Sequence, residues 1–227
     1  NNFIGYNTFY DCNGILECGS GNGGIMKDNV FAYNKMINNS SLFYISSGGS
    51  FAVTVKNLQF YNNVVVENTA PRLGAYAASA KTALSAGSAD SNIVVFKNNI
   101  FWLTTGVDVC RSGQLAAYQF THENNIYRLG GTSYLNFTAN PSELSTSTAA
   151  IFSNSAPSDP IGWNYRLTTG SPAINFGQNV GINRDFEGVT VPATPHAGLL
   201  QSLTNTASPL TVSASSTTAI ACNGGST

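Results

Sequence analysis

The chain has 227 residues, of which 42% are hydrophobic and only 9% are charged, and its formal net charge is −1. This size accommodates one large domain, or one domain with a tail. The balanced charge disfavours a protein that binds nucleic acid irrespective of sequence, because such proteins carry a basic excess. No apolar run of about 18 residues occurs, so we expect no transmembrane helix.

Asparagine is unusually frequent, with 27 copies. Its side chain bonds to nearby backbone groups and tolerates the left-handed conformation, so it favours turns over helices. Together with glycine and short β-branched and aromatic runs, it predicts an all-β protein with many turns. The first residues, Asn1 to Gly5, already read as the middle of a structural repeat. We therefore expect the chain to be part of a longer protein.

A unit of Asn followed by an aromatic residue recurs along the chain. Its copies are Asn7-Thr8-Phe9, Asn29-Val30-Phe31, the looser Asn57-Leu58-Gln59-Phe60, Asn99-Ile100-Phe101 and Asn125-Ile126-Tyr127. Successive Asn anchors are 22, 28, 42 and 26 residues apart. A coil of three short strands and three turns needs roughly 20–30 residues, and stacked coils bury the apolar side chains that one coil leaves exposed. We predict a right-handed parallel β-helix, a solenoid of about five or more coils.

Such stacking predicts columns of like side chains. The five aromatic residues of the unit are expected to form one inward column, and the Asn anchors one column at a corner. A leucine-rich repeat would need regular Leu spacing, which is absent.

The longest spacing indicates an insertion over about residues 69–91, rich in Ala and Ser. Leu73, Tyr76, Ala77, Ala80 and Leu84 fall at helical spacing. We interpret the insertion as a short helix or lid lying on the coils, with a disordered loop as an equal alternative.

The chain changes character after about residue 161. Ser171-Pro172-Ala173-Ile174-Asn175 is followed by Asp185-Phe186-Glu187-Gly188 and by Ala197-Gly198-Leu199. This order resembles the end of many secreted β-helix proteins of the polysaccharide-lyase-like (pectin-lyase-like) superfamily, which carry Ser-Pro-Ala-Ile-Asp, an Asp-x-x-Gly turn and a short closing strand. Asn175 replaces the usual Asp, and the closing strand is only approximate. The resemblance covers residues 1–201 and implies the fold and secretion more than an activity.

Residues 202–227 have a different composition. They resemble the start of a β-sandwich repeat of the kind found in large secreted adhesins of gliding bacteria. We expect an extended tail or the start of a following module, after a β-helix domain over residues 1–201.

Outward lysines are the main candidate for binding. Lys27, Lys97 and Glu123 each lie two residues before the Asn of a repeat, and Lys56 lies one residue before its anchor. Strand alternation predicts that they form one outward strip, with His122 at its end, along which a polyanion could lie. The alternative is that exposed strands simply carry the few lysines available. His122 and Glu123 could be a base and its partner, but we favour a salt bridge between Glu123 and Lys97 of the adjacent coil. Arg72 and Tyr76 on the insertion and Arg111 are expected beside the strip.

The resemblance implies β-elimination as the chemistry to test, in which a base removes the proton beside a uronate carboxylate. The catalytic candidates are Lys97, His122 and Arg111. A glycoside hydrolase would need clustered carboxylates, and only Asp11 and Asp28, in adjacent coils, could approach each other. We expect His196, in the terminal motif, to be structural.

No cofactor is expected. Asp28, Asp90 and Asp108 are scattered and match no calcium loop. The Gly19–Gly24 run fits a dinucleotide-binding pattern, but no helix follows, so we interpret it as a turn. Cys12 and Cys18 lie close enough for a disulfide, although buried thiols are favoured.

The sequence thus predicts a secreted or cell-surface monomer that binds a polysaccharide or cell-surface glycan without catalysis. The alternative is a polysaccharide lyase that acts on an acidic glycan by β-elimination.

Overall fold

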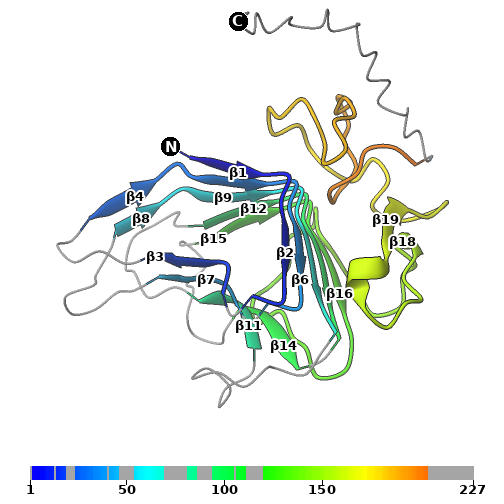
Figure 1. Cartoon of the computed structure of the whole chain (residues 1–227), viewed down its shortest axis with the longest axis horizontal. Coiled ribbons are helices and arrows are strands. Elements are labelled where there is room, and N and C mark those ends of the chain that lie inside the picture. Colours follow the sequence, from blue (N-terminus) through cyan, green and yellow to red (C-terminus); the bar gives the residue numbers. More distant parts are fainter. Residues whose placement is uncertain are drawn as a thin grey trace, which may run out of the picture.

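The computed structural model describes residues 2–12, 14–18, 24–39, 41–45, 54–68, 81–85, 94–104, 106–110 and 120–203. Nearly all the regular structure in these residues is β. Three parallel sheets, here called A, B and C, surround a common interior (Figure 1).

Sheet A contains β1 (Phe3–Gly5), β5 (Val30–Ala32), β9 (Leu58–Tyr61), β12 (Val94–Lys97) and β15 (Phe120–Glu123). Sheet B contains β2 (Thr8–Tyr10), β6 (Lys35–Ile37), β10 (Val64–Glu67), β13 (Ile100–Leu103), β16 (Ile126–Leu129) and β17 (Leu144–Thr146). Sheet C contains β3 (Leu16–Cys18), β7 (Ser41–Ile45), β11 (Lys81–Ser85) and β14 (Val107–Cys110). Sheet D pairs β4 (Ile25–Lys27) with β8 (Thr54–Lys56), also in parallel.

The chain visits sheets A, B and C in turn, and each strand pairs in parallel with the strand one pass further along. We call each pass a coil. The first pass aligns Phe3 with Val30 and Phe9 with Met36, so the repeat there is 27 residues. The sequence-based prediction of an all-β chain with parallel strands is confirmed.

Two inward columns run along the coils. In sheet A, Ile4, Phe31, Phe60, Phe96 and His122 are aligned. In sheet B, Phe9, Met36, Val65, Phe101 and Tyr127 are aligned. The single aromatic column expected from the sequence is therefore wrong. Phe31 stacks on Phe60 at 5.0 Å in one column, and Phe101 stacks on Tyr127 at 5.5 Å in the other.

The corner between sheets A and B is a two-residue turn that repeats in every coil. Its first residue has a positive φ, and its second is always Asn. The first positions are Tyr6, Tyr33, Asn62, Asn98 and Asn124, and the second are Asn7, Asn34, Asn63, Asn99 and Asn125. The predicted Asn column exists here, but Asn29 and Asn57 do not belong to it, because they lie at the preceding corner, before β5 and β9.

This column forms a ladder of hydrogen bonds. The backbone N–H and Nδ2 of Asn34 both donate to Oδ1 of Asn63, at 2.9 and 3.0 Å. Nδ2 of Asn63 donates in turn to the Phe31 carbonyl and to Oδ1 of Asn99. Each amide thereby satisfies corner groups that a tight turn inside the protein would leave without partners.

The insertion differs from its predicted helix. Residues 81–85 form β11, which pairs with β7 and β14 and so belongs to sheet C. Leu84, which was part of the helical spacing, is in this strand. Residues 69–80 and 86–93 lie outside the described residues.

Residues 151–201 cover the outer face of sheet B. They include the short 3₁₀ helix η3 (Pro160–Gly162) and the antiparallel pair of β18 (Phe152–Asn154) and β19 (Asn164–Leu167). Trp102 on the outer face of β13 packs against Phe152 and Trp163, at 5.6 and 4.9 Å between ring centroids. A second apolar core therefore lies outside the coils, between sheet B and this segment.

The terminal motif docks on the corner between sheets A and B. Nδ2 of Asn62 donates to the carbonyls of His196 and Gly198, and the Gly198 N–H donates to the Asn98 carbonyl. Gly198 has φ +85°, and a Cβ there would lie 2.6 Å from Cδ1 of Ile100. The expected closing strand at residues 197–199 is instead an irregular segment held by these contacts.

Candidate functional site

The predicted lysine strip is split into two pairs by the fold. Lys97 is aligned with Glu123 at the end of sheet A that leads into the Asn ladder. Lys27 is aligned with Lys56 in sheet D, which precedes sheet A in each coil. The four side chains do not form one surface. Lys27 and Lys56 precede one corner of the coil, whereas Lys97 and Glu123 precede the next.

Lys97 and Glu123 neutralise each other. Nζ of Lys97 lies 2.9 Å from Oε2 of Glu123, and Nε2 of Gln178 donates to the same oxygen at 2.8 Å. Hydrogen bonds from Gln178 and then Lys97 lower the pKa of Glu123. The predicted ion pair between adjacent coils is confirmed, and it leaves Lys97 without the free charge that a catalytic or anion-binding lysine would need.

Lys27 and Lys56 form an exposed basic pair. Both side chains are exposed, and among the described residues neither has an ion-pair partner. Like charges aligned on neighbouring strands are unfavourable. An anionic group bound between these ammonium groups would relieve that repulsion.

The outer face of sheet A lies beyond the corner that follows this pair in each coil. One outward column aligns Phe3, Val30, Gln59, Val95 and Thr121. Phe3 is 51% exposed, and the other four side chains are half-buried. Residues 151–201 reach the opposite edge of the sheet, where Gln178 contacts Glu123. The face thus offers an apolar ring and polar groups beside two lysines.

His122 points into the coils, because it is aligned with the inward Phe96. Its ring packs against Phe120 and Phe137, at 4.5 and 4.8 Å. Nδ1 of His122 lies 2.6 Å from Oε2 of Glu143, whose side chain is fully buried. The expectation that His122 ends an outward strip is therefore wrong, and its partner is Glu143 rather than Glu123.

Glu143 closes the Asn ladder. Its Oε1 accepts from Nδ2 of Asn125 and from the Tyr127 hydroxyl, both at 2.7 Å, and its Oε2 also accepts from the Asn140 N–H at 2.9 Å. Glu143 was not predicted from the sequence, because it lies outside the repeat. The one indication in the sequence was that Asn125, the last Asn of the ladder, needs a hydrogen-bond acceptor for its Nδ2.

We predict an acid-sensitive step from Glu143. Burial alone raises the pKa of this carboxyl, but hydrogen bonds from His122, Asn125, Asn140 and Tyr127 together outweigh it and bring the pKa below its ordinary value of 4.5. The folded state then binds fewer protons than the unfolded state, so this contribution to stability is complete above pH 4.5 and is lost as the pH falls through the lowered pKa.

Chemical denaturation between about pH 6 and pH 3 measures this step. The wild-type chain should lose more free energy of unfolding over that range than Glu143→Gln. Asp185 changes the stability in the opposite direction. Its pKa is raised, mainly by burial, so its contribution to the free energy of unfolding is lost as the pH rises. Identical slopes for wild type and variant would contradict the assignment to Glu143.

The remaining candidates are three residues outside the described part of the chain and the carboxylates of Asp11 and Asp28. Arg72, Tyr76 and Arg111 lie outside the described residues. Asp11 follows β2 and Asp28 precedes β5, so the two carboxylates lie at different corners. No cluster of three or more metal-ligating side chains occurs among the described residues.

The surroundings of His196 and Cys12 indicate structural roles. The buried His196 accepts the Asn175 N–H at Nδ1 and bonds to Gln201 at its backbone. Cys12 is a free thiol, so the alternative of a disulfide with Cys18 is wrong.

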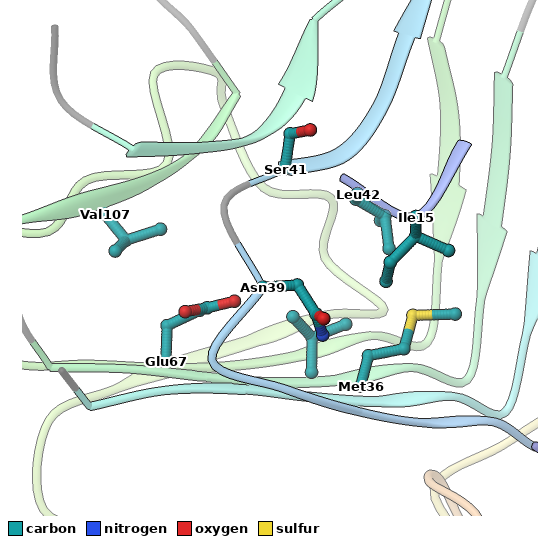
Figure 2. Close-up of a pocket in the computed structure, with 8 residues that line it drawn as sticks. Ile15, Met36, Asn39, Ser41, Leu42, Glu67 and Val107 are labelled. Atoms are coloured by element: carbon teal, nitrogen blue, oxygen red, sulfur yellow. The ribbon is translucent and has the colours of Figure 1, made fainter. Parts of the chain in front are cut away.

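A small cavity lies inside the coils between sheets B and C (Figure 2). Its lining is mostly apolar, with Asn39, Ser41 and the buried Glu67 as polar members. It has room for about one water molecule. This space is too small for a sugar ring.

Comparison with protein-family models found no match, and a search of curated proteins found no significantly similar sequence. No helix among the described residues is long and apolar enough to cross a membrane.

Proposed function

We propose that the chain is a right-handed parallel β-helix of the pectin-lyase-like kind that binds a polysaccharide or cell-surface glycan without catalysis. The ordered passage through sheets A, B and C and the inward columns support the helix. The motif at residues 171–198 supports the family and a secreted or cell-surface location. The adhesin-like character of residues 202–227 rests on their sequence.

The basic pair of Lys27 and Lys56 is the observation that carries the glycan proposal. Two adjacent ammonium groups without acidic partners among the described residues match a carboxylate or sulfate on a sugar. The outer face of sheet A lies beyond the next corner of the coil and provides Phe3 for the apolar side of a sugar ring, with Gln59 for its hydroxyls. An acidic glycan lying along the coils would contact both.

The non-catalytic reading is supported by the partners of the catalytic candidates. Lys97 is held in an ion pair, and His122 is directed into the core against Glu143. A lyase base must reach the proton that it removes from a substrate on the outer face. His122 is directed away from that face, and Lys97, although it points outward, is paired with Glu123.

Titration calorimetry with acidic and neutral oligosaccharides tests the proposal. We expect binding of an acidic oligosaccharide to weaken at least about tenfold in the Lys27→Ser/Lys56→Ser variant, because two charge-assisted contacts are lost. The control is Lys97→Met/Glu123→Gln, which removes a neutralised pair without changing the net charge and should weaken binding less than threefold. Equal affinity for parent and basic-pair variant would reject the surface.

The lyase alternative is tested in the same preparations. Formation of unsaturated products from alginate, pectate or glycosaminoglycans, followed by their ultraviolet absorbance, would establish elimination and refute the non-catalytic reading. The absence of binding to every glycan would refute both.

A further inference from the structure

Arg128, on the outer face of sheet B, has terminal nitrogens without an acceptor among the described residues. The structure describes two other arginines, and both are engaged. Arg166 donates from Nη1 and Nη2 to the carboxylate of Glu187, and Nη1 of Arg184 donates to the Gly188 carbonyl. Arg128 is half-buried and donates only from Nε. Its terminal nitrogens are not among the atoms that are both buried and unpartnered in the described part of the chain, so they reach solvent.

The guanidinium group of Arg128 is held in one orientation by two contacts. Its Nε donates to the Ala149 carbonyl at 3.1 Å, and its Cζ lies over the Trp102 ring, 3.7 Å from the centroid. Trp102 is itself packed between Phe152 and Trp163. A side chain that is already ordered loses little freedom when it binds a ligand.

The loop that supplies the Ala149 carbonyl is fixed as well. Thr146 is aligned with Arg128 on the neighbouring strand of sheet B. Its Oγ1 accepts the N–H groups of Thr148 and Ala149, at 3.3 and 3.2 Å, which turns the chain back toward Arg128. The orientation of the guanidinium group is therefore built into the local fold.

The charge of Arg128 is only partly hydrated and has no ion-pair partner among the described residues. Burial lowers the pKa of this side chain. A bound anion would replace the hydration that burial removes. Because Nε is already used, the edge that carries Nη1 and Nη2 remains, and its two N–H groups match the two oxygens of one carboxylate.

We propose that Arg128 binds one carboxylate group of a small ligand through Nη1 and Nη2, in the orientation set by Trp102 and the Ala149 carbonyl. Arg128 is aligned with Trp102 in sheet B, whereas Lys27 and Lys56 lie in sheet D, so this site is separate from the basic pair. Free carboxylic acids and uronic acid sugars share the chemistry that the site recognises.

Titration followed by tryptophan fluorescence tests the proposal, because Trp102 lies against the guanidinium group. The probes are acetate, methyl glucuronoside and the neutral methyl glucoside, at constant ionic strength. We expect a saturable response to the carboxylates, with a Kd on the order of 1–10 mM, and none to the glucoside. Equal binding of both carboxylates supports a site for free acids, and tighter binding of the glucuronoside supports one for an acidic sugar.

Saturation-transfer NMR of the ligand measures the variants, since it does not depend on Trp102. Arg128→Gln should weaken binding at least about tenfold, because both charge-assisted hydrogen bonds are lost. Arg128→Lys keeps the charge but not the planar group and should weaken it at least about threefold. The matched control Arg184→Gln, at an exposed arginine, should leave the affinity within about twofold of the parent.

Lys27→Ser/Lys56→Ser should also leave carboxylate binding at Arg128 unchanged, which separates this site from the glycan surface. No saturable response to either carboxylate would overturn the proposal, and so would equal affinity in the parent and both Arg128 variants. Sulfate binding as tight as that of acetate would overturn the assignment to a carboxylate.

Discussion

Replacing Glu143 with Ala should reduce the free energy of unfolding by about 3–5 kcal/mol, because a buried carboxylate with several partners is removed. The substitution leaves Nδ2 of Asn125 and the Tyr127 hydroxyl inside the protein without this acceptor, and it removes the acceptor of the exposed Asn140 N–H. It also removes the partner of His122. Urea denaturation at neutral pH measures the loss.

Glu123→Ala is the matched control, since it also breaks an ion pair between a Glu and a basic side chain. Glu123 is 42% exposed in its side chain and Lys97 25%, so water compensates both after the substitution. The expected loss is below about 1 kcal/mol. Equal losses in the two variants would mean that Glu143 does not hold the end of the coils together.

The sequence predicted the β architecture because stacking repeats the same residue types in every coil. The predicted alignment of the coils was wrong because two corners of each coil contain similar residues. Asp28 and Asn57 have positive φ before β5 and β9, just as Asn98 has before β13. A spacing of 28 residues between Asn29 and Asn57 therefore looks like that of one column, although Asn57 is aligned with Asp28.

The candidate site shows the same limit. Alternation correctly placed Lys97 outward from Phe96, and the same rule puts His122 inward from Glu123, a signal that the sequence contained. Glu143 could not be placed, because it follows an irregular segment whose path depends on tertiary packing. The covering of sheet B by residues 151–201 was likewise unpredictable, because outward Trp102 and inward Phe101 look equally apolar in sequence.

Asn63→Asp should be at least as damaging as the loss of Glu143, although it changes one amide group to a carboxylate of the same shape. Asn63 is 1% exposed, in the middle of the ladder. Its Nδ2 donates to the Phe31 carbonyl and to Oδ1 of Asn99, and a carboxylate oxygen in that place would face two acceptors. We expect a loss of about 4 kcal/mol or more, since a buried charge is left unpaired.

Two further variants separate the charge from the lost hydrogen bonds. Asn63→Ala removes the same donors without adding a charge and should cost about 2–3 kcal/mol. Asn179→Asp is the neutral control, because the exposed Asn179 uses only its Oδ1, to accept the Gly181 N–H at 2.8 Å, and Asp preserves that acceptor. If Asn63→Asp lowers the free energy of unfolding no more than Asn63→Ala does, water reaches the ladder and hydrates the carboxylate. The amides would then contribute ordinary hydrogen bonds.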